Sequence, residues 1–593
     1  MRKVLVSVSL FTCMAACATA PRSSPPPASV SAVATPAASA DALLGKLEER
    51  MIAETVAYDP AAAYFIGVPA PDNRRWADHS LEAIARYRAE RAALLADVRR
   101  INSAELSPAR RFIHASMVER LESEQQLVKA CRYELWDVNH MSGWHLEPAD
   151  VAREQPVGTE AQRAEAMERW SKLPQMIDQE IANARTGLES GYSAPKSVVR
   201  RAIKQIETIA SSKPEALPYW QLAERSNDEP FKTAFRGVLA GPVQEAFRRY
   251  HRFLADEYLP RARETIAITG NPNGRACYEA SLRAYTTLTR SPEEVFRLGQ
   301  ETVDANVATV KKLAREKWGS EDLSTIIKRI TNAPDNRFKS EEDLITFSRE
   351  VVARSREKSA SLFLRMPPQE MRVEPFEAYR RGTGGSSYYE RQIDPLRPAF
   401  YRIASERWES ETRGGAEITA VHEGYPGHHM QLSFATMTAP GPIANLLGNS
   451  AYGEGWARYS EALSEEAGLY RTDYALMTRR LWPARGMVVD PGIHLMGWSR
   501  EKAIAFIRES GRFAGPEADD LVDRIAVWPG QLTAYDSGGL EIKALRQQAE
   551  QALGSCFDIR EFHARVLETG IVPLTALRSN VEAWIATRQC PRP

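Results

Sequence analysis

Residues 421–431 read Val-His-Glu-Gly-Tyr-Pro-Gly-His-His-Met-Gln, and this stretch limits how the chain around it can fold. On a straight α-helix, His428 would lie about 240° around the axis from His422 and about 9 Å along it, too far to share one ion. Pro426 removes an N–H that would bond to the carbonyl group of His422, and the neighbouring glycines permit backbone angles closed to other residues. We therefore expect residues 424–427 to bulge out of the helix and to bring His428 back beside His422.

The same stretch carries the side chains that a catalytic zinc site needs. Such a site uses neutral imidazoles as ligands, an open position for water and a nearby carboxylate that takes the water proton. His422 and His428 supply the imidazoles, Glu423 supplies the base, and His429 is an alternative second ligand. Three of the ten histidines fall within eight residues, which favours a metal site over polar groups buried between helices.

We expect a third ligand from a helix further along the chain. Glu454 lies 26 residues after His428 and stands between two glycines. A carboxylate that joins two histidines and leaves one position open is a known catalytic arrangement. Glu461 and Glu465 are rival ligands on the same helix face, although a solvated acidic stripe is the simpler interpretation of both.

The run His422–Gln431, followed by Glu454-Gly-Trp-Ala, resembles the bacterial DUF885 family. Further blocks similar to that family are Val489–His494 with Gly497-Trp498, Trp528–Gln531 running to Tyr535 and Gly538, and Trp170–Pro174 with Gly187–Gly191. The resemblance covers most of the chain after about residue 45. It implies a largely helical, metallopeptidase-like fold, with His422, His428 and a downstream glutamate as zinc ligands and Glu423 as the base. Asp536-Ser537 stand where the family pattern has a basic and an apolar residue.

In this interpretation, the metal lowers the pKa of its bound water to roughly 7. Glu423 then takes the proton as the water attacks a carbonyl carbon, and the resulting oxyanion needs further donors. His494 and Tyr535 are the candidates, since both lie in segments punctuated by Pro and Gly. A hydrogen-bonded position in a helix interface is the alternative for each. Asp490 is expected either to orient a histidine or to cap the helix that follows.

Substrate contacts are expected just before the metal motif. Residues 379–389 form a Gly-rich loop in which Arg380 or Arg381 could meet a peptide carboxylate, with solvated loop arginines as the alternative. Residues 396–402 are expected to form a short strand, which Pro398 would confine to a sheet edge. An edge strand beside the site could hold an extended peptide by main-chain bonds.

The first residues indicate export. Arg2-Lys3 precede a mostly apolar run from Val4 to about Cys13, which is typical of a secretory signal and too short for an ordinary membrane span. Met14-Ala-Ala-Cys17 resembles a bacterial lipobox, which would be cut before the cysteine.

We expect residues 1–16 to be a signal peptide and Cys17 to carry a lipid. Residues 17–40, rich in Pro, Ser and Ala, would then be a disordered tether to the bacterial cell envelope, on the periplasmic side. Plain signal cleavage near Ala18–Ala20, which would give a soluble exported protein, is the alternative.

Four cysteines remain after this leader: Cys131, Cys277, Cys556 and Cys590. An exported location permits disulfides. Cys556 and Cys590 flank the last helical region and are the expected pair, although spacing alone allows three connectivities. Because none of the four lies in a Cys-x-x-Cys pattern, neither a cysteine zinc site nor a catalytic cysteine is expected.

Composition and periodicity describe the body of the protein. Basic and acidic residues number 77 each, so no net field favours nucleic acid. Apolar residues recur at helical spacing through most of the chain, which predicts a mainly α fold with a minor β element before the metal motif. We expect an N-terminal helical lobe over residues 41–270, a catalytic helical lobe over 271–593 and a cleft between them.

Three functions remain open on the sequence. The first is a peptidase with one zinc ion, and the second is a zinc amidase or deacylase that acts on non-peptide amides. The third is a lipid-anchored binding protein with a structural metal, which the intact Glu423 argues against because a closed structural site needs no base. Other divalent ions also suit imidazole and carboxylate ligands.

Overall fold

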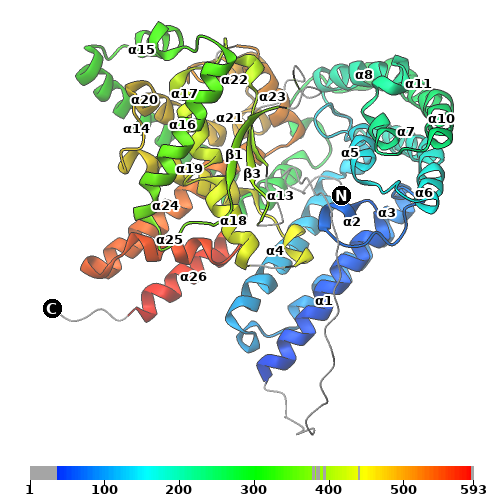
Figure 1. The fold of residues 1–593 in the computed structure, drawn as a ribbon, viewed down its shortest axis with the longest axis horizontal. Helices are drawn as coiled ribbons and strands as arrows, with labels where there is room; N and C mark the ends of the chain where they lie inside the picture. Colours follow the sequence, from blue (N-terminus) through cyan, green and yellow to red (C-terminus); the bar gives the residue numbers. More distant parts are fainter. Residues whose placement is uncertain are drawn as a thin grey trace.

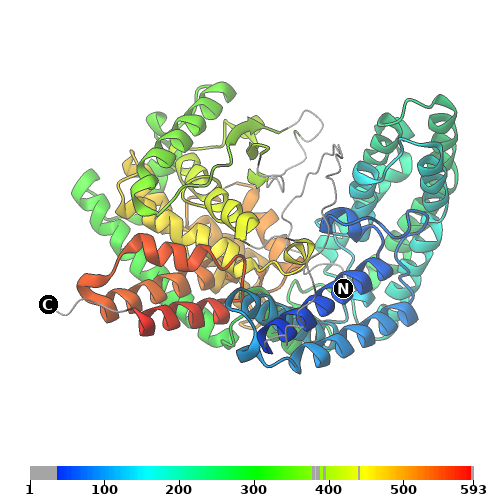
Figure 2. The ribbon, with the colours of Figure 1, turned by 60° about the horizontal axis from the view of Figure 1, so that its bottom comes forward.

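The computed structural model describes residues 36–376, 381, 387–390, 396–438, 441–513 and 515–588. Within these residues nearly all regular structure is helical, and the strands form one small sheet (Figures 1 and 2). The expectation of a mainly α fold with a minor β element before the metal motif is confirmed. The predicted signal peptide and the lipidation site Cys17 lie outside the described residues.

The first helix begins earlier than the sequence pattern indicates. α1 spans Pro36–Tyr58, so residues 36–40, expected to belong to a disordered tether, are helical. Proline suits the first turn of a helix because its missing N–H needs no partner there, and alanine has the highest helix propensity. The tether prediction is therefore wrong for these five residues.

The N-terminal part of the chain consists of helices. Those of residues 147–252 lie on the opposite side of the molecule from the last two helices of the chain (Figure 1), whereas the helix of residues 108–131 contacts the last one. The main helices of the N-terminal part are α1, α2 (Ala62–Ile66), α3 (Leu81–Arg99), α4 (Pro108–Cys131), α5 (Glu147–Glu154), α6 (Glu160–Ser171), α7 (Leu173–Glu189), α8 (Lys196–Ser211), α9 (Gln221–Glu224), α10 (Glu229–Val238), α11 (Gln244–Arg252) and α12 (Leu259–Arg261). Aromatic side chains fill the space between them, with Trp170 fully buried against Trp76, Tyr219 and Phe235.

The C-terminal part holds the remaining helices. They are α13 (Gly274–Thr286), α14 (Pro292–Trp318), α15 (Leu323–Asn332), α16 (Glu341–Ser359), α17 (Arg413–Glu423), α18 (His428–Thr438), α19 (Ser450–Glu466), α20 (Asp473–Leu481), α21 (Arg485–His494), α22 (Arg500–Arg508), α23 (Glu517–Val527), α24 (Ala534–Leu553), α25 (Ile559–Leu567) and α26 (Leu574–Thr587). Local sequence sets their ends: Ser291 caps α14 ahead of Pro292, and Gly319 closes it with φ 72°.

Helices α19 and α24 cross at very close range. Gly455 and Gly538 face each other there, and a Cβ at Gly538 would overlap the carbonyl oxygen of Ala451. The crossing therefore depends on glycine at both positions. Because Glu454 precedes Gly455 and Tyr535 lies in the first turn of α24, the crossing also fixes these two side chains relative to each other.

The sheet has the order β1-β3-β2, with β1 (Met371–Pro375), β2 (Tyr388–Glu390) and β3 (Ala399–Ile403). β3 pairs in parallel with β1 and antiparallel with β2, so it is the central strand. The strand expected over residues 396–402 is present, but its expected position at an edge is wrong. Pro398 lies just before β3, which leaves every amide of the strand able to donate, beginning with Ala399 N to Glu370 O at 2.8 Å.

Most buried apolar residues pack against others from the same half of the chain. One cluster runs from Ala61 to Ala280 and another from Leu288 to Val581, so the change falls close to the lobe boundary expected near residue 270. Two smaller clusters join the halves. Helices α1, α3 and α4 pack on Ile443, Leu446 and Leu447, and Val198 and Ile266 pack among residues 482–532.

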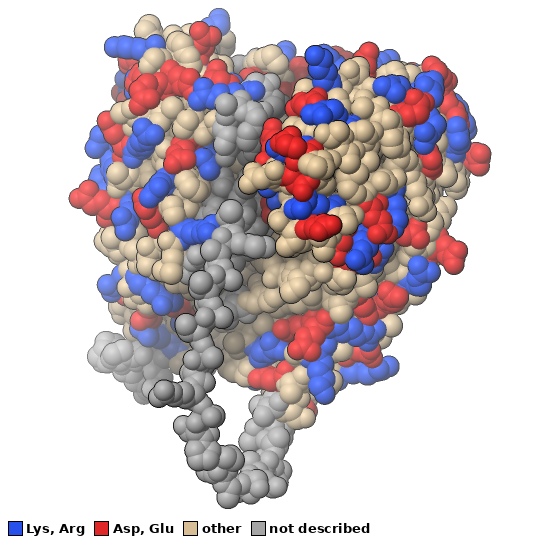
Figure 3. Space-filling view, turned by 45° about the vertical axis from the view of Figure 1, so that its right-hand side comes forward, with Lys and Arg blue, Asp and Glu red and all other residues tan. Residues whose placement is uncertain are grey.

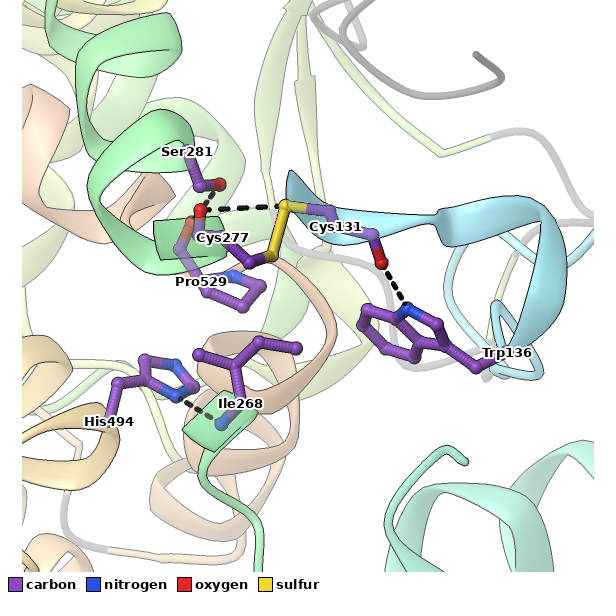
Figure 4. Close-up of a disulfide and its surroundings, with 7 residues drawn as sticks. All are labelled: Cys131, Trp136, Ile268, Cys277, Ser281, His494 and Pro529. Carbon is purple, nitrogen blue, oxygen red and sulfur yellow. Dashed lines mark hydrogen bonds between the residues drawn. A yellow bond between two sulfur atoms is a disulfide. The ribbon is translucent and has the colours of Figure 1, made fainter. Parts of the chain in front are cut away.

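A disulfide between Cys131 and Cys277 joins the end of α4 to α13 (Figure 4). Cys556 is also disulfide-bonded, and its expected partner Cys590 lies outside the described residues. None of the described helices combines the length and the apolar composition that crossing a bilayer requires. On the face shown in Figure 3, Lys and Arg are interspersed with Asp and Glu, as the balanced composition predicts.

Candidate metal centre

The helix that carries the motif is broken where the sequence predicts. α17 ends at Glu423 and α18 begins at His428, with a cis Tyr425–Pro426 peptide bond between them. Gly427 N donates to Val421 O at 3.1 Å, and a Cβ at Gly427 would overlap the carbonyl oxygens of His422 and Val421. The chain therefore folds back tightly on the last turn of α17, and only glycine fits at 427.

This return brings His422, His428 and Glu454 together. Glu454 Oε2 lies 3.5 Å from His422 Nε2 and 3.4 Å from His428 Nε2, and the ligand atoms of all three lie within 4.8 Å of one another. Atoms bound tetrahedrally to one zinc ion at 2.0–2.2 Å would be about 3.3–3.6 Å apart. Both distances to Glu454 match this spacing, so the three side chains form a candidate site for a single ion.

His429 does not belong to this cluster. It is fully buried, its Nε2 donates to Gln369 O at 3.0 Å, and its Nδ1 accepts from the Tyr389 hydroxyl at 3.1 Å. Both ring nitrogens are thus used within the fold. Of the two candidate second ligands, the geometry selects His428.

A buried carboxylate supports His422 from behind. Glu461 Oε1 lies 2.9 Å from His422 Nδ1, and Arg458 Nη1 donates to both oxygens of Glu461 at 2.9 and 2.7 Å. Glu461 is fully buried, so the expectation of a solvated acidic stripe is wrong for this residue. Arg458 also lies 3.1 Å from Asp536, which explains an acidic residue where the family pattern has a basic one.

Glu465, the other rival ligand, faces away from the cluster. Arg480 Nη2 lies 2.5 Å from its carboxylate, and Arg479 donates to the second oxygen. Two arginines thus occupy both oxygens of Glu465, which leaves Glu454 as the carboxylate beside the two histidines.

α19 also holds the returning loop. Trp456 Nε1 donates to Pro426 O at 2.9 Å, and Ser460 Oγ donates to the same oxygen at 3.1 Å. Trp456 is fully buried. One helix therefore supplies the third candidate ligand, the support for His422 and the clamp on the loop. Trp456 belongs to the family-like block Glu454-Gly-Trp-Ala but Ser460 carries no motif signal, and only the three-dimensional structure reveals the role of both.

Electrostatics within the cluster favour a cation. Burial would lower the pKa of His422, but hydrogen bonds to Glu454 and Glu461 and the charge of Glu423 raise it to about 9. Burial would raise the pKa of Glu454, but the hydrogen bonds and charges of His422 and His428 hold it well below its usual range. When no ion is bound, the histidine side chains therefore hold protons that balance the charge of the carboxylates. A divalent cation would displace these protons.

Glu423, the expected base, lies at the same site. It is 8% exposed, and burial raises its pKa above the ordinary value despite the charges of His422 and His428. A raised pKa makes this carboxylate a stronger proton acceptor than an ordinary glutamate, which suits a general base.

Tyr535 lies beside the cluster, as expected for an oxyanion donor. Its ring centroid is 6.4 Å from that of His422, with the planes inclined at 22°. Its hydroxyl accepts a hydrogen bond from Arg524 Nη2 at 3.2 Å, and the same Nη2 donates to Gln531 Oε1 at 2.7 Å.

His494 has a different role from the one expected. It is fully buried, its Nδ1 accepts from Ile268 N at 3.0 Å (Figure 4), and its Nε2 donates to Ile525 O at 3.0 Å. Burial lowers its pKa to about 3. Because both nitrogens are bonded to main-chain groups, neither is available as an oxyanion donor. The imidazole instead ties α21 to α23 and to the segment before α13.

Asp490 neither orients a candidate ligand nor caps a helix. It lies inside α21, where Tyr278 Oη and Gly530 N each donate to its Oδ1 at 2.9 Å. Burial raises its pKa to about 7. The capping expectation is therefore wrong, and the nearest histidine is His494, whose Nε2 lies 3.9 Å from Oδ1 of Asp490 and donates to Ile525 O instead.

Only one of the two loop arginines lies within the described residues. Arg380 lies outside the described residues. Arg381 Nη2 lies 2.9 Å from Glu341 Oε1, so its charge is already matched within the protein.

A recess lies where the N-terminal helices meet α13 and α23. Aromatic, aliphatic and acidic side chains line it, and they include Tyr58, Tyr133, Trp144, Tyr285, Trp528, Glu124, Glu134, Asp137 and Glu180. Trp528 connects this recess to the candidate metal centre, because the guanidinium carbon of Arg524 lies 5.8 Å from the Trp528 ring centroid and equally far from that of Tyr535.

A break between two helices that gathers two histidines and a glutamate within a mainly helical fold defines a candidate metalloprotein. The chain belongs to the DUF885 family, whose description is "Bacterial protein of unknown function" and whose model matches residues 60–581. No curated protein matches the sequence.

Two solved structures share the fold. One, described as "the putative lipoprotein from Colwellia psychrerythraea", has a TM-score of 0.82 and 21% identity, and the match covers 93% of this chain and 100% of that one. The other, "a putative lipoprotein of unknown function from Shewanella oneidensis", has a TM-score of 0.73 and 18% identity over 92% and 99% of the two chains. The architecture thus extends over nearly the whole length of each.

Proposed function

We propose that this protein is a zinc-dependent peptidase of the bacterial cell envelope. The observation that carries the proposal is the proximity of His422, His428 and Glu454, with the base Glu423 next to the first ligand. Structural zinc sites are closed by four protein ligands, whereas catalytic sites use three and leave a position for water. A cluster of three with a neighbouring carboxylate is therefore more consistent with catalysis than with a structural ion.

A bound zinc ion would polarise the scissile carbonyl group and acidify a water molecule so that it reacts near neutral pH. Glu423 accepts the proton of the attacking water and returns it to the leaving amine. Glu461 accepts the Nδ1–H hydrogen bond of His422, which fixes the tautomer in which Nε2 offers a lone pair to the ion.

Tyr535 supplies a hydrogen bond to the oxyanion. Because Arg524 donates to the phenol oxygen, the hydrogen of the phenol itself remains for an acceptor. Burial raises the pKa of Tyr535, so the group stays protonated and able to donate. A donor aimed at a developing oxyanion in a site of low dielectric typically contributes about 3–4 kcal/mol to the rate.

Other observations support the substrate class and the cellular location. The recess beyond Trp528, with its aromatic and aliphatic side chains, suits the side chains of a flexible peptide. The lipobox-like residues Met14–Cys17, together with the descriptions of the two structurally similar proteins, support a lipid-anchored envelope protein.

The test combines metal analysis with hydrolysis. The full-length protein should hold one zinc ion per chain and cleave members of a panel of short peptides. Chelation should abolish the activity, and added zinc should restore it. His428→Ala should lose metal and activity, whereas His251→Ala, a partly exposed histidine on α11, should keep both. Cleavage of acylated small amides without peptides would indicate a deacylase, and the absence of any chelation-reversible hydrolysis would contradict the proposal.

A further inference from the structure

Arg524, on α23, is a cation without an anionic partner. In the described part of the chain its only hydrogen bonds run from Nη2 to the neutral groups of Gln531 and Tyr535. Its Nε is buried and has no partner, and none of the described carboxylates lies within ion-pair distance of its guanidinium. Two of its three nitrogens therefore have no acceptor.

Other buried arginines of the described chain are matched by carboxylates or by several neutral acceptors. Arg458 meets Glu461 and Asp536, and Arg354 meets Glu417. Arg169, which has no carboxylate, instead donates from all three nitrogens to two carbonyl oxygens and a tyrosine hydroxyl. Other arginines also keep one buried nitrogen without a partner, but four of these face a carboxylate: Arg88, Arg91, Arg290 and Arg458. Arg263 donates to main-chain carbonyl oxygens instead. Arg524 bonds only to neutral side chains, and the cost of burying a charge in this way implies a ligand.

The nearest negative groups do not compensate Arg524. The charge of Glu454 acts on its pKa, and its own charge acts on that of Asp490, but neither carboxylate reaches it. An ion held by Glu454 would also take up that negative charge. In the metal-loaded protein, Arg524 would therefore attract an anion more strongly.

Arg524 lies between the candidate metal centre and the recess. On one side it bonds to the hydroxyl of Tyr535, whose ring lies 6.4 Å from that of His422. On the other side it lies over Trp528, which lines the recess. An anionic group that reaches Arg524 is thus about one side chain away from a metal ligand.

We propose that Arg524 is a carboxylate-binding subsite that receives the C-terminal carboxylate of a peptide, so that the enzyme releases C-terminal residues. This inference rests on the proposed function. One extended residue spans about 3.3–3.6 Å, so a carboxylate on the residue after the scissile bond lies within a short reach of the attacked carbonyl group. Hydrolysis breaks that last amide bond: water gives its hydroxyl to the acyl carbon and its proton to the amine that leaves.

Arg524 suits this role better than the loop arginine predicted from sequence. Arg381 is already paired with Glu341, so a substrate carboxylate would have to displace a protein carboxylate there. Arg524 offers Nη1 without that competition. An acidic side chain of a substrate could also present a carboxylate to Arg524. Experiment can distinguish it from a C-terminal carboxylate.

The experiment compares three peptides of equal length on the full-length, zinc-loaded protein. One has a free C-terminal carboxylate, the second has a C-terminal amide, and the third has a C-terminal amide on a glutamate residue. The free acid should be cleaved with a kcat/KM about 10- to 100-fold higher than the plain amide, the usual range for a hydrogen bond to a charged group. A preference for the amidated glutamate peptide over the free acid would overturn terminal recognition in favour of a side chain.

Variants of Arg524 distinguish a role in carboxylate recognition from a purely structural role. Arg524→Gln should remove the preference for the free acid, Arg524→Lys should keep part of it, and Arg86→Gln, at an exposed position of α3, should leave it unchanged. A purely structural role would lower both rates equally. A preference that survives in Arg524→Gln with normal zinc content would overturn the proposal, as would equal rates on acid and amide in the unmodified protein.

Binding provides a readout that does not need catalysis. Titration of the zinc-loaded protein with N-acetyl-phenylalanine and with its amide should show tighter binding of the acid, lost in Arg524→Gln. If no peptide is hydrolysed but this difference is found, the proposed function fails and the subsite stands. Equal binding of acid and amide would overturn the subsite independently of any activity.

Discussion

The Nδ1 atom of His422 lies 2.9 Å from Oε1 of Glu461, a carboxylate that is fully buried and held by Arg458. Carboxylates in this position behind a metal-binding histidine fix its tautomer and its orientation. Burial would raise the pKa of Glu461, but the charge of Arg458 and the contact with His422 lower it to about 2, so the carboxylate stays ionised. Glu461 is not itself a candidate ligand, but its contact with His422 gives it a defined role at the site.

Glu461→Gln should weaken zinc binding by about 10- to 100-fold while one ion still binds at saturation. The amide keeps the volume of the side chain but presents a neutral group to His422. Competition with a chromophoric chelator measures the affinity. Glu466→Gln, one turn further along α19 and largely exposed, is the control. Unchanged affinity in Glu461→Gln would show that the contact with His422 does not support a metal ligand.

Glu423→Gln should retain zinc and lose turnover by about 10²- to 10⁴-fold, because the variant cannot accept the proton of the attacking water. Metal content and single-turnover hydrolysis measure the two properties separately. Glu316→Gln, on the exposed face of α14, should change neither. Near-normal turnover in zinc-loaded Glu423→Gln would remove this residue from the mechanism.

Gly538→Ala should destabilise the protein by about 1–3 kcal/mol or more and weaken zinc binding, because its Cβ would push α24 away from Ala451 and so shift Glu454. Gly237, inside α10, has open space around a built Cβ, so Gly237→Ala should instead stabilise by about 0.4–1 kcal/mol. Urea unfolding of both variants tests the contrast. A neutral Gly538→Ala would mean that the two helices can move apart freely.

Asp490 should make the protein less stable as the pH rises from about 4 to 7. Burial raises its pKa from 3.8 to about 7 in the folded state, so the folded protein binds more protons than the unfolded chain over this range. The free energy of unfolding therefore falls as the pH increases, and Asp490→Asn should flatten the curve by an amount on the order of a few kcal/mol. Urea denaturation at several pH values measures this. Parallel curves for the two proteins would contradict the assignment.

Much of the candidate site could be predicted from local chemistry. Pro426 and Gly427 cannot continue the helix begun by α17, so the break follows from backbone sterics alone. The choice of His428 over His429 could not be predicted from local sequence. It depends on the hydrogen bonds of His429 to Gln369 and Tyr389, which lie 60 and 40 residues away in the chain. Glu454 could be named as a ligand because its glycine neighbours mark it as unusual.

The errors share a cause, since each concerns a group whose partner is distant in sequence. Glu461 has the pattern of a surface residue, and its burial depends on its contact with His422 and on the packing of α19 against α17. His494 has the pattern of a catalytic residue, but main-chain groups near residues 268 and 525 use both of its nitrogens. Arg524 has no motif signal, and only its lack of an acidic partner in the folded protein reveals it.

The most direct test of the account is the anomalous diffraction signal of zinc in crystals of the zinc-loaded protein. The account predicts one peak about 2.0–2.2 Å from Nε2 of His422, Nε2 of His428 and a carboxylate oxygen of Glu454. That peak should be absent in crystals of Glu454→Ala grown with the same metal. Crystals of the unmodified protein with no zinc bound to these three residues, or with zinc only at another position, would contradict the account.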